Sequence, residues 1–539
     1  MNMISHLLQR WLKLPPPVTR NLAVQRDLRV PMPDGAELLA DRWAPRSGGE
    51  ALPTALIRCP YGRRGVLAMA MARPLAERGF QVLIQSTRGG FGSGGAFDPL
   101  RQEREDGLAT LDWVIKQPWF GGSIVLVGVS YMGYVQWAVA DALPPEVKAM
   151  IPQVTESALT LEFLRKDGMS LETPFGWGAL IAVQERPLAM LRQPFQAKKI
   201  RRALSTLPLN QADVAAVGRR SDYIQDILTH DADAPRWAGL DHSDRVAQVT
   251  VPVSSIGGWY DIFLPGQLRD FRILQEAGRP ARVTVGPWTH TAFNNTGVLE
   301  AIEFGLAHAR GEQPPHRLPV RLFVMGEEAW RDFETWPPPG YSPQRFHLQP
   351  SGALSTETAG DSVPDRYRYD PADPTPAAGG VVMNGGGRVD NGSLEARADV
   401  LTYTSDALEE DVEVIGEVGA EIWFRSSLPY ADVFVRLCDV DPGGRSANVC
   451  DGLVSLSGAE EITRATVKLW PTAYRFKRGH RIRVQVSSGA FPRYARNPGT
   501  GESRATATTL RAADQEVYHD SAHRSAVILP IRSAGSTGQ

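Results

Sequence analysis

Cysteine is scarce in this chain of 539 residues, which contains only Cys59, Cys438 and Cys450. An odd number spread so thinly argues against a disulfide framework, and a reducing compartment fits better. We therefore expect a cytoplasmic protein. Cys438 and Cys450 could face one another across a hairpin, but we favour buried free thiols. Because no cluster of Cys and His has metal-ligand spacing, we expect no metal ion.

Long apolar runs and an excess of one charge are also absent. No run approaches the roughly 20 apolar residues that span a bilayer. Lys plus Arg number 58 and Asp plus Glu number 60, for a net charge of -2. No global field therefore points to nucleic acid or to an anionic membrane. A small neutral ligand is the simpler expectation, and a homodimer stays open.

The first 20 residues form an amphipathic extension with apolar side chains at helical spacing. Arg10 and Lys13 interrupt the apolar pattern and no small-residue cleavage site follows it, so the segment is a poor secretory signal. It could lie on a membrane or on a partner. We favour packing on the protein's own surface.

The pattern of the chain changes twice, which together with its length predicts three domains. Strands and helices alternate over residues 21–156 and 245–340, as in a parallel sheet covered on both faces. Residues 157–244 are charged and helical, and they predict an inserted cap. After the PPPG break at 337–340, short alternating strands over 341–539 predict a β-sandwich of the jelly-roll kind.

Residues 123–141 combine a strand pattern with a helix pattern. The apolar run 124–127 predicts a buried parallel strand, and apolar residues then recur at helical spacing as far as Leu143. Ser130 therefore lies on a sharp turn, where a serine can be exposed as a nucleophile. The usual G-x-S-x-G pattern is only partly met, because Met132 stands where the second glycine would be.

A serine nucleophile on such a sheet requires an acid and then a histidine, each after a later strand. Asp261 follows the strand pattern at 251–256, and His290 follows the one at 281–285. His290 would take the serine proton, and Asp261 would orient the imidazole. Alone, each residue fits a helix cap or a packed surface position. The alternative bases follow no strand and are His230, His308 and His316.

Four segments carry a resemblance to a known family: 58–62 (RCPYG), 128–133 (GVSYMG), 258–261 (GWYD) and 286–290 (GPWTH). On these, the chain resembles the cocaine esterase and X-Pro dipeptidyl-peptidase family of serine hydrolases, which also contains α-amino-acid ester hydrolases. The resemblance implies an α/β-hydrolase domain with an inserted helical cap and a C-terminal jelly roll. It implies an esterase that works without a cofactor through an acyl-enzyme, with amides, X-Pro peptides or amino esters as alternative substrates. An inert glycan-binding or scaffold protein is the alternative of another class.

The resemblance also implies roles that spacing does not reveal. Tyr61 would donate its hydroxyl to the oxyanion, together with the backbone N–H of Tyr131. Trp177 and Phe263 would line a pocket for a hydrophobic or aromatic acyl group. For Trp177, a core position in a cap helix is an equal alternative.

The chain departs from the family pattern near the third strand, where Ser86 replaces the usual acid before Thr-Arg-Gly. We therefore expect Arg88 either to lack a buried partner or to pair with Asp98 or Glu105.

Amino-ester and dipeptide members of the family recognise a free amine with carboxylates of the cap. The cap acids of this chain, Glu156, Glu162 and Glu172 among them, stay unassigned, and so does the substrate.

Overall fold

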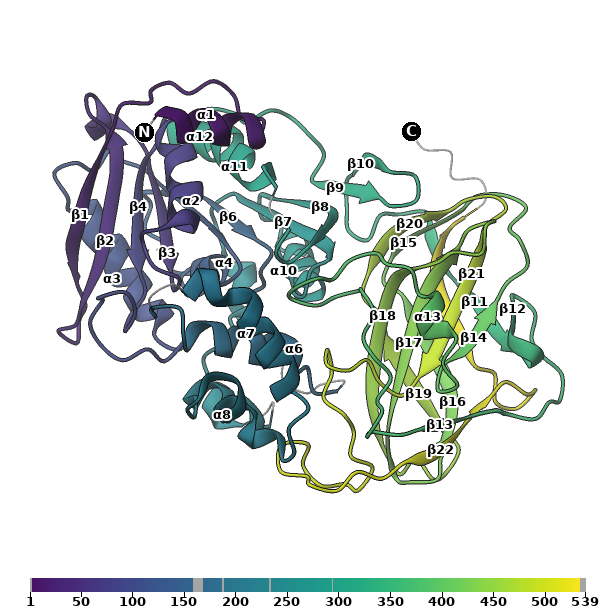
Figure 1. Cartoon of the computed structure of the whole chain (residues 1–539). Helices are drawn as coiled ribbons and strands as arrows, with labels where there is room; N and C mark the ends of the chain where they lie inside the picture. Colours follow the sequence, from purple (N-terminus) through teal and green to yellow (C-terminus); the bar gives the residue numbers. More distant parts are fainter. Residues whose placement is uncertain (1, 159–167, 187–188, 232–233, 293, 534–539) are drawn as a thin grey trace.

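A computed structural model describes the chain except for residues 1, 159–167, 187–188, 232–233, 293 and 534–539. The strands form two large assemblies in successive parts of the chain. Helices surround the first, and the second is a β-sandwich that lies beside it (Figure 1). The predicted architecture of a helix-covered sheet followed by a β-rich part is thus confirmed.

The first sheet has ten strands in the order β1-β2-β4-β3-β5-β6-β7-β8-β9-β10. From β4 to β9 all neighbours are parallel, whereas the β1–β2, β2–β4 and β9–β10 pairs are antiparallel. Its strands are β1 (Leu22–Pro31), β2 (Glu37–Pro45), β3 (Thr54–Cys59), β4 (Gln81–Ser86), β5 (Ile124–Val129), β6 (Val147–Gln153), β7 (Val253–Tyr260), β8 (Ala281–Thr289), β9 (Val320–Val324) and β10 (Ala329–Phe333).

Alternate residues of the central strand β5 point into two different cores. Val125 and Val127 pack on one face of the sheet, with apolar residues of α2. Ile124 and Leu126 pack on the other face, with apolar residues of α3 and α10. Burial on both faces explains the unbroken apolar run, because each such side chain contributes roughly 1.5–3 kcal/mol when fully buried. The helices around the sheet are α2 (Val66–Ala76), α3 (Glu103–Ile115), α4 (Tyr131–Trp137), α10 (Leu264–Glu276), α11 (Thr296–Glu300) and α12 (Leu306–Arg310).

Two local features differ from what the sequence patterns indicate. Strand β6 lies between β5 and β7, and the sequence does not predict it because Lys148 and Pro152 break its apolar pattern. Helix α4 ends at Trp137 and does not continue to Leu143. The chain tightens there into i to i+3 hydrogen bonds, from Val139 to Ala142, which keep the apolar side chains pointing inward.

The described part of the cap is helical and contains no strand of either sheet. Its apolar residues, such as Phe175 and Ile224, form a core of their own, joined by Ala495 and Ala505 from the C-terminal part. Figure 1 shows the long C-terminal loop beneath the cap helices. These helices are α6 (Glu172–Ile181), α7 (Ala189–Ala203), α8 (Ala212–Val217) and α9 (Asp222–Thr229).

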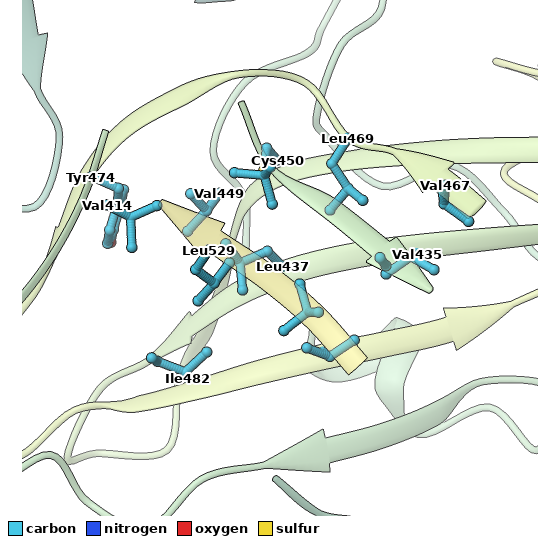
Figure 2. Packing of buried hydrophobic residues seen from close by; sticks show 14 of the residues in the cluster. Val414, Val435, Leu437, Val449, Cys450, Val467, Leu469, Tyr474, Ile482 and Leu529 are labelled. Atoms are coloured by element: carbon cyan, nitrogen blue, oxygen red, sulfur yellow. The ribbon is translucent and has the colours of Figure 1, made fainter. Parts of the chain in front are cut away.

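The C-terminal strands form a 13-stranded assembly in which the neighbours, apart from the β12–β14 pair, are antiparallel. Figure 2 shows side chains from several of these strands, Val435, Ile482 and Leu529 among them, meeting in one core. The strands are β11 (Tyr341–Gln349), β12 (Ala353–Ser355), β13 (Asp365–Tyr369), β14 (Leu401–Thr404), β15 (Val412–Gly416), β16 (Gly419–Ser426), β17 (Tyr430–Val440), β18 (Ser446–Ser457), β19 (Thr463–Lys468), β20 (Thr472–Phe476), β21 (Arg481–Ser487), β22 (Ala513–Tyr518) and β23 (Ala526–Arg532), with the short helix α13 (Gly392–Glu395) between β13 and β14.

The cysteines are all buried and free. Cys438 lies on β17 and Cys450 on β18, and the register pairs Leu437 with Cys450 and Cys438 with Asn448. The favoured interpretation of free thiols is confirmed.

The N-terminal helix α1 (Asn2–Trp11) packs on α2, and the Ser5 hydroxyl donates a hydrogen bond to Glu77 at 2.8 Å. Packing on the protein's own surface is therefore confirmed for one face of α1. Its opposite face carries Met3, Leu7 and Trp11, which expose 75%, 60% and 64% of their surface. Among the helices that the structure describes, none is long and apolar enough to cross a bilayer.

Candidate active site

Ser130 lies on the turn from β5 to α4 with φ 56° and ψ −124°, a strained conformation for a residue other than glycine. Neighbouring backbone groups hold it there. Its N–H donates to the carbonyl of Gln153 on β6 at 2.8 Å. Its own carbonyl accepts hydrogen bonds from the N–H groups of Gly133 and Tyr134 at 2.8 and 3.0 Å. These hydrogen bonds hold the strained turn, which places the hydroxyl beyond the carboxyl end of β5.

Close packing of α4 on the sheet explains the two glycines around this turn. A Cβ on Gly128 would lie 2.4 Å from the carbonyl oxygen of Met132, and one on Gly133 would lie 2.4 Å from Cγ2 of Thr155. Met132 itself is buried in the core beneath the sheet. The second glycine stands one place later than in G-x-S-x-G because a core side chain occupies the usual position.

Ser130, Asp261 and His290 meet at one edge of the sheet. The Oγ of Ser130 lies 3.0 Å from Nε2 of His290, and Nδ1 of His290 lies 2.7 Å from Oδ2 of Asp261. They come from the carboxyl ends of β5, β7 and β8, which converge at the same edge of a parallel sheet. Asp261 is fully buried, and its Oδ1 accepts a hydrogen bond from the Phe263 N–H at 2.8 Å. The carboxylate is therefore held in one orientation towards His290.

The alternative histidines lie elsewhere. His230 contacts Asp226 and Trp237 in the cap. His308 packs edge-on against Phe304, on α12 behind the sheet. His316 is exposed on the loop before β9.

Tyr61 follows β3 and places its hydroxyl between two partners. The hydroxyl accepts a hydrogen bond from Nε1 of Trp177 at 2.9 Å and forms another with Ser130. Burial raises the pKa of Tyr61 to about 12, against the smaller lowering effect of these hydrogen bonds. The phenol therefore keeps its proton at neutral pH and can donate a hydrogen bond to an oxyanion that forms beside Ser130.

The side chain of Tyr131 points away from this chemistry. Its hydroxyl donates to Glu103 at 2.6 Å and accepts from the Leu100 N–H at 2.7 Å. Burial, followed by the charge of Glu103, raises the pKa of Tyr131 well above its usual value. Because Tyr131 is the first residue of α4, its N–H has no acceptor within the helix, and this group can face the site.

Trp177 and Phe263 both lie beside these groups. Trp177, on α6, stacks on Tyr131 with ring centroids 5.8 Å apart and meets the edge of Tyr223 at 4.8 Å. Phe263 packs edge-on against the His290 ring at 5.3 Å. The structure thus brings both predicted pocket residues to the site, and Trp177 contacts more than the core of the cap.

One of the unassigned cap acids also reaches the site. The carboxylate of Glu172 accepts hydrogen bonds from the Thr173 hydroxyl and from the N–H of Met383, each at 3.2 Å. Burial raises its pKa, although these bonds and the charges of Arg493 and His290 oppose the rise. No sequence pattern points to this position, because the segment around Met383 comes from the distant C-terminal part.

The other two cap acids that the sequence left unassigned are Glu156 and Glu162. Glu156 is fully buried and lies 3.6 Å from a guanidinium nitrogen of Arg269, and Glu162 lies outside the described residues. Within the described part of the chain, no three His, Cys, Asp or Glu side chains converge as metal ligands.

The expected partners of Arg88, Asp98 and Glu105, are wrong, and so is the alternative that Arg88 lacks a buried partner. Arg88 pairs with Asp106 on α3 at 2.6 Å and with Asp34 at 2.6 Å. Asp106 is buried on the helix face that meets the sheet, whereas Glu105 is exposed. Asp98 pairs instead with Arg101 and Arg236, at 2.7 and 3.5 Å.

Comparison with known proteins gives matches over both parts of the chain. The model of the X-Pro dipeptidyl-peptidase (S15 family) matches residues 34–292, and that of the X-Pro dipeptidyl-peptidase C-terminal non-catalytic domain matches residues 316–528. The cocaine esterase of Rhodococcus sp. (strain MB1 Bresler) is 33% identical, over 95% of this chain and 99% of that protein.

Solved structures share the fold. An aminopeptidase from a marine sediment archaeon of the Thaumarchaeota superposes with a TM-score of 0.80 at 22% identity, covering 95% of this chain and 97% of its own. An α-amino acid ester hydrolase superposes with a TM-score of 0.80 at 19% identity, covering 96% of this chain and 97% of its own. The predicted α/β-hydrolase fold with a C-terminal β-rich domain is confirmed.

Proposed function

The chain belongs to the serine hydrolase family described as X-Pro dipeptidyl-peptidase (S15 family), and we propose that it hydrolyses carboxylic esters through an acyl-enzyme at Ser130. One observation carries the proposal. Ser130 Oγ, both nitrogens of His290 and the Asp261 carboxylate form one line of hydrogen bonds, at 3.0 and 2.7 Å. This is the arrangement that turns a serine hydroxyl into a nucleophile.

The reaction proceeds in two halves. His290 takes the Ser130 proton as Oγ attacks the ester carbonyl, and the buried Asp261 carboxylate stabilises the imidazolium. The Tyr61 hydroxyl and the Tyr131 N–H donate to the oxyanion, and one such donor lowers the barrier by roughly 2.7–4 kcal/mol. His290 then protonates the departing alcohol. In the second half His290 activates a water molecule, which releases the acid and regenerates Ser130.

A hydrophobic or aromatic acyl group fits the surroundings of Ser130 best. Trp177 and Phe263 flank the site, and Tyr223 and Val381 belong to the same apolar cluster. An aromatic ring in this cluster gains edge and stacking contacts beyond simple burial, worth roughly 0.5–1.5 kcal/mol per pair. We therefore propose aryl-acyl esters as the preferred class, and amides as slower substrates because an amine leaves less readily than an alcohol.

Glu172 favours a second candidate, the hydrolysis of esters or dipeptides that carry a free amine. Its carboxylate interacts electrostatically with His290, and an ammonium group on the acyl side would place a further positive charge beside it, in addition to that of Arg493. The solved relatives include an α-amino acid ester hydrolase and an aminopeptidase. A panel of aryl, alkyl, amino-acyl and X-Pro substrates would rank the two candidates.

Each part of the chain has a proposed task. Residues 21–156 with 245–340 carry the catalytic groups, 157–244 cover them as the cap, and 341–539 form the jelly roll that closes the site from the other side.

The scarcity of cysteine supports a cytoplasmic location. The exposed apolar face of α1 supports a homodimer that buries it, which light scattering would test.

Ser130 itself provides the direct test. The Ser130→Ala variant should lose p-nitrophenyl ester turnover by at least about 10⁴-fold while its circular dichroism spectrum stays that of the wild type. A fluorophosphonate probe should label the wild type at Ser130 and leave the variant unlabelled. Wild-type turnover in the variant, or labelling at another serine, would show that the assignment is wrong. No labelling in the intact protein would favour the inert glycan-binding or scaffold alternative.

A further inference from the structure

The C-terminal part of the chain touches the backbone of the proposed catalytic acid directly. Trp470, on the connection between β19 and β20, donates a hydrogen bond from Nε1 to the carbonyl oxygen of Asp261 at 3.0 Å. The same carbonyl meets the Leu264 N–H at the longer distance of 3.4 Å. The indole is therefore the closer of these two donors, and it comes from more than 200 positions along the chain.

Trp470 is held firmly in its own sheet. Its backbone N–H donates to the carbonyl of Asp451 on β18 at 3.0 Å. The backbones approach so closely here that a Cβ on Gly452 would lie 2.0 Å from the carbonyl oxygen of Lys468. Leu469, which precedes Trp470, and Cys450, which precedes Asp451, both lie in the core that Figure 2 shows. The position of the indole is therefore fixed by the packing of the C-terminal core.

A buried network of ion pairs around Asp451 also holds the Trp470 indole ring in place. The Arg493 guanidinium lies over the Trp470 ring, 5.1 Å from its centroid, and pairs with Asp451. Arg436 pairs with the other oxygen of Asp451 at 2.9 Å. Burial alone would raise the pKa of Asp451, but Arg493 and then Arg436 lower it below its usual value. The aspartate thus stays charged and keeps Arg493 in place over the ring.

We propose that Trp470 is a positioning residue for the reaction, through which the C-terminal domain sets the orientation of Asp261 towards His290. The inference rests on the proposed function of Ser130, Asp261 and His290. Asp261 lies on a turn at the end of β7, so its carboxylate moves when the turn rotates. The indole N–H fixes the carbonyl of that turn, and the carboxylate then meets Nδ1 of His290 at 2.7 Å.

Trp470→Phe tests the proposal because it keeps the aromatic ring and removes the N–H donor. With p-nitrophenyl acetate, kcat should fall about three- to tenfold, the effect of one hydrogen bond, while KM stays within about twofold of the wild type. Trp423→Phe is the matched control, a half-buried tryptophan of the same sheet whose ring packs on His523. It should keep the wild-type kcat. An unchanged kcat in Trp470→Phe, or an equal loss in Trp423→Phe, would overturn the proposal.

Arg493→Lys provides a second route if Trp470→Phe folds poorly. It keeps the charge beside Asp451 and removes the planar group over the indole. Its kcat should fall by a smaller factor in the same direction, and the double variant should be no slower than Trp470→Phe alone, because Arg493 acts through Trp470. Unchanged kcat in Arg493→Lys, or independent losses in the double variant, would overturn the proposal. Activity that survives Ser130→Ala would instead overturn the proposed function itself.

Discussion

Trp177 donates a hydrogen bond from its indole nitrogen to the hydroxyl of Tyr61 at 2.9 Å, which connects the cap to the proposed oxyanion site. Because the indole is a donor only, it occupies a lone pair of the Tyr61 oxygen and leaves the phenol proton available to another acceptor. The Tyr61 hydroxyl also forms a hydrogen bond with Ser130. The cap helix α6 therefore orients the phenol towards the carbon that Ser130 would attack.

Removal of the Tyr61 hydroxyl should slow the chemical step with little effect on binding. We expect Tyr61→Phe to lower kcat about 10²- to 10³-fold, because a donor aimed at the oxyanion acts mainly in the transition state. Steady-state kinetics with p-nitrophenyl acetate provides the measurement. Tyr367→Phe is the control, since it removes the buried hydroxyl that bonds to Ser488 in the β-sandwich. A loss confined to KM would contradict the oxyanion role.

The aromatic wall should affect large acyl groups more than small ones. We expect Trp177→Ala to reduce kcat/KM for p-nitrophenyl benzoate about tenfold more than for the acetate, because a benzoyl ring loses its aromatic contacts. Both esters lose the help that Trp177 gives Tyr61, so this part cancels in the ratio. Trp113→Ala, at a half-buried tryptophan that packs on Trp119, should leave the ratio unchanged. Equal losses for both esters would mean that Trp177 serves only the cap and Tyr61.

The sequence predicts those parts of the site that depend on local pattern. Ser130, Asp261 and His290 each follow a recognisable strand, and parallel strands place their carboxyl ends at one edge. Only the family resemblance pointed to Tyr61, because an aromatic residue after a strand has no distinctive spacing.

Contacts between distant segments leave no periodic signal, so no sequence pattern predicts them. Glu172 meets Met383 across 211 positions, and Trp470 meets Asp261 across 209. The error at Arg88 has a smaller cause. Neighbouring residues of a helix point about 100° apart, so a shift of one residue separates the exposed Glu105 from the buried Asp106.

Glu172 should select for amine-bearing esters in a manner that depends on pH. Glu172→Gln should lower kcat/KM for an alanine p-nitrophenyl ester about tenfold relative to the acetate, because the carboxylate charge is lost. Burial raises the pKa of Glu172. Its charge, and with it the preference for the amine, is therefore present above that pKa and should fade on acidification at a higher pH than for an exposed glutamate.

The exposed Glu105 on α3 provides the control variant, Glu105→Gln, which should keep the wild-type ratio at every pH. The ratio of the two esters is measured from about pH 4 to 8, a range that spans ordinary and raised carboxyl pKa values. A ratio that does not respond to Glu172→Gln would exclude the amine-recognition candidate and leave neutral esters as the substrates.

The buried ion network of Asp451 should contribute strongly to the stability of the C-terminal sheet. Asp451→Asn leaves Arg436 and Arg493 without their shared carboxylate, which for a buried pair costs about 3–5 kcal/mol and would lower Tm by about 6–20 °C. Asp514→Asn removes only the exposed pair with Arg368 and should change Tm by less than about 4 °C. Differential scanning calorimetry compares the two variants with the wild type.

The same network predicts how stability responds to acid. The two guanidinium groups overcome the effect of burial and place the pKa of Asp451 in the folded protein below its value in the unfolded chain. The unfolded chain then binds the proton at the higher pH, so the stabilisation is complete above the unfolded pKa of about 3.9 and is lost as pH falls through the lower folded pKa. The difference in Tm between Asp451→Asn and the wild type should therefore stay constant from about pH 7 to 5 and shrink below about pH 4. A difference that already shrinks between pH 7 and 5 would mean that Asp451 is protonated in the folded protein and that Arg493 has no charged partner to hold it over Trp470.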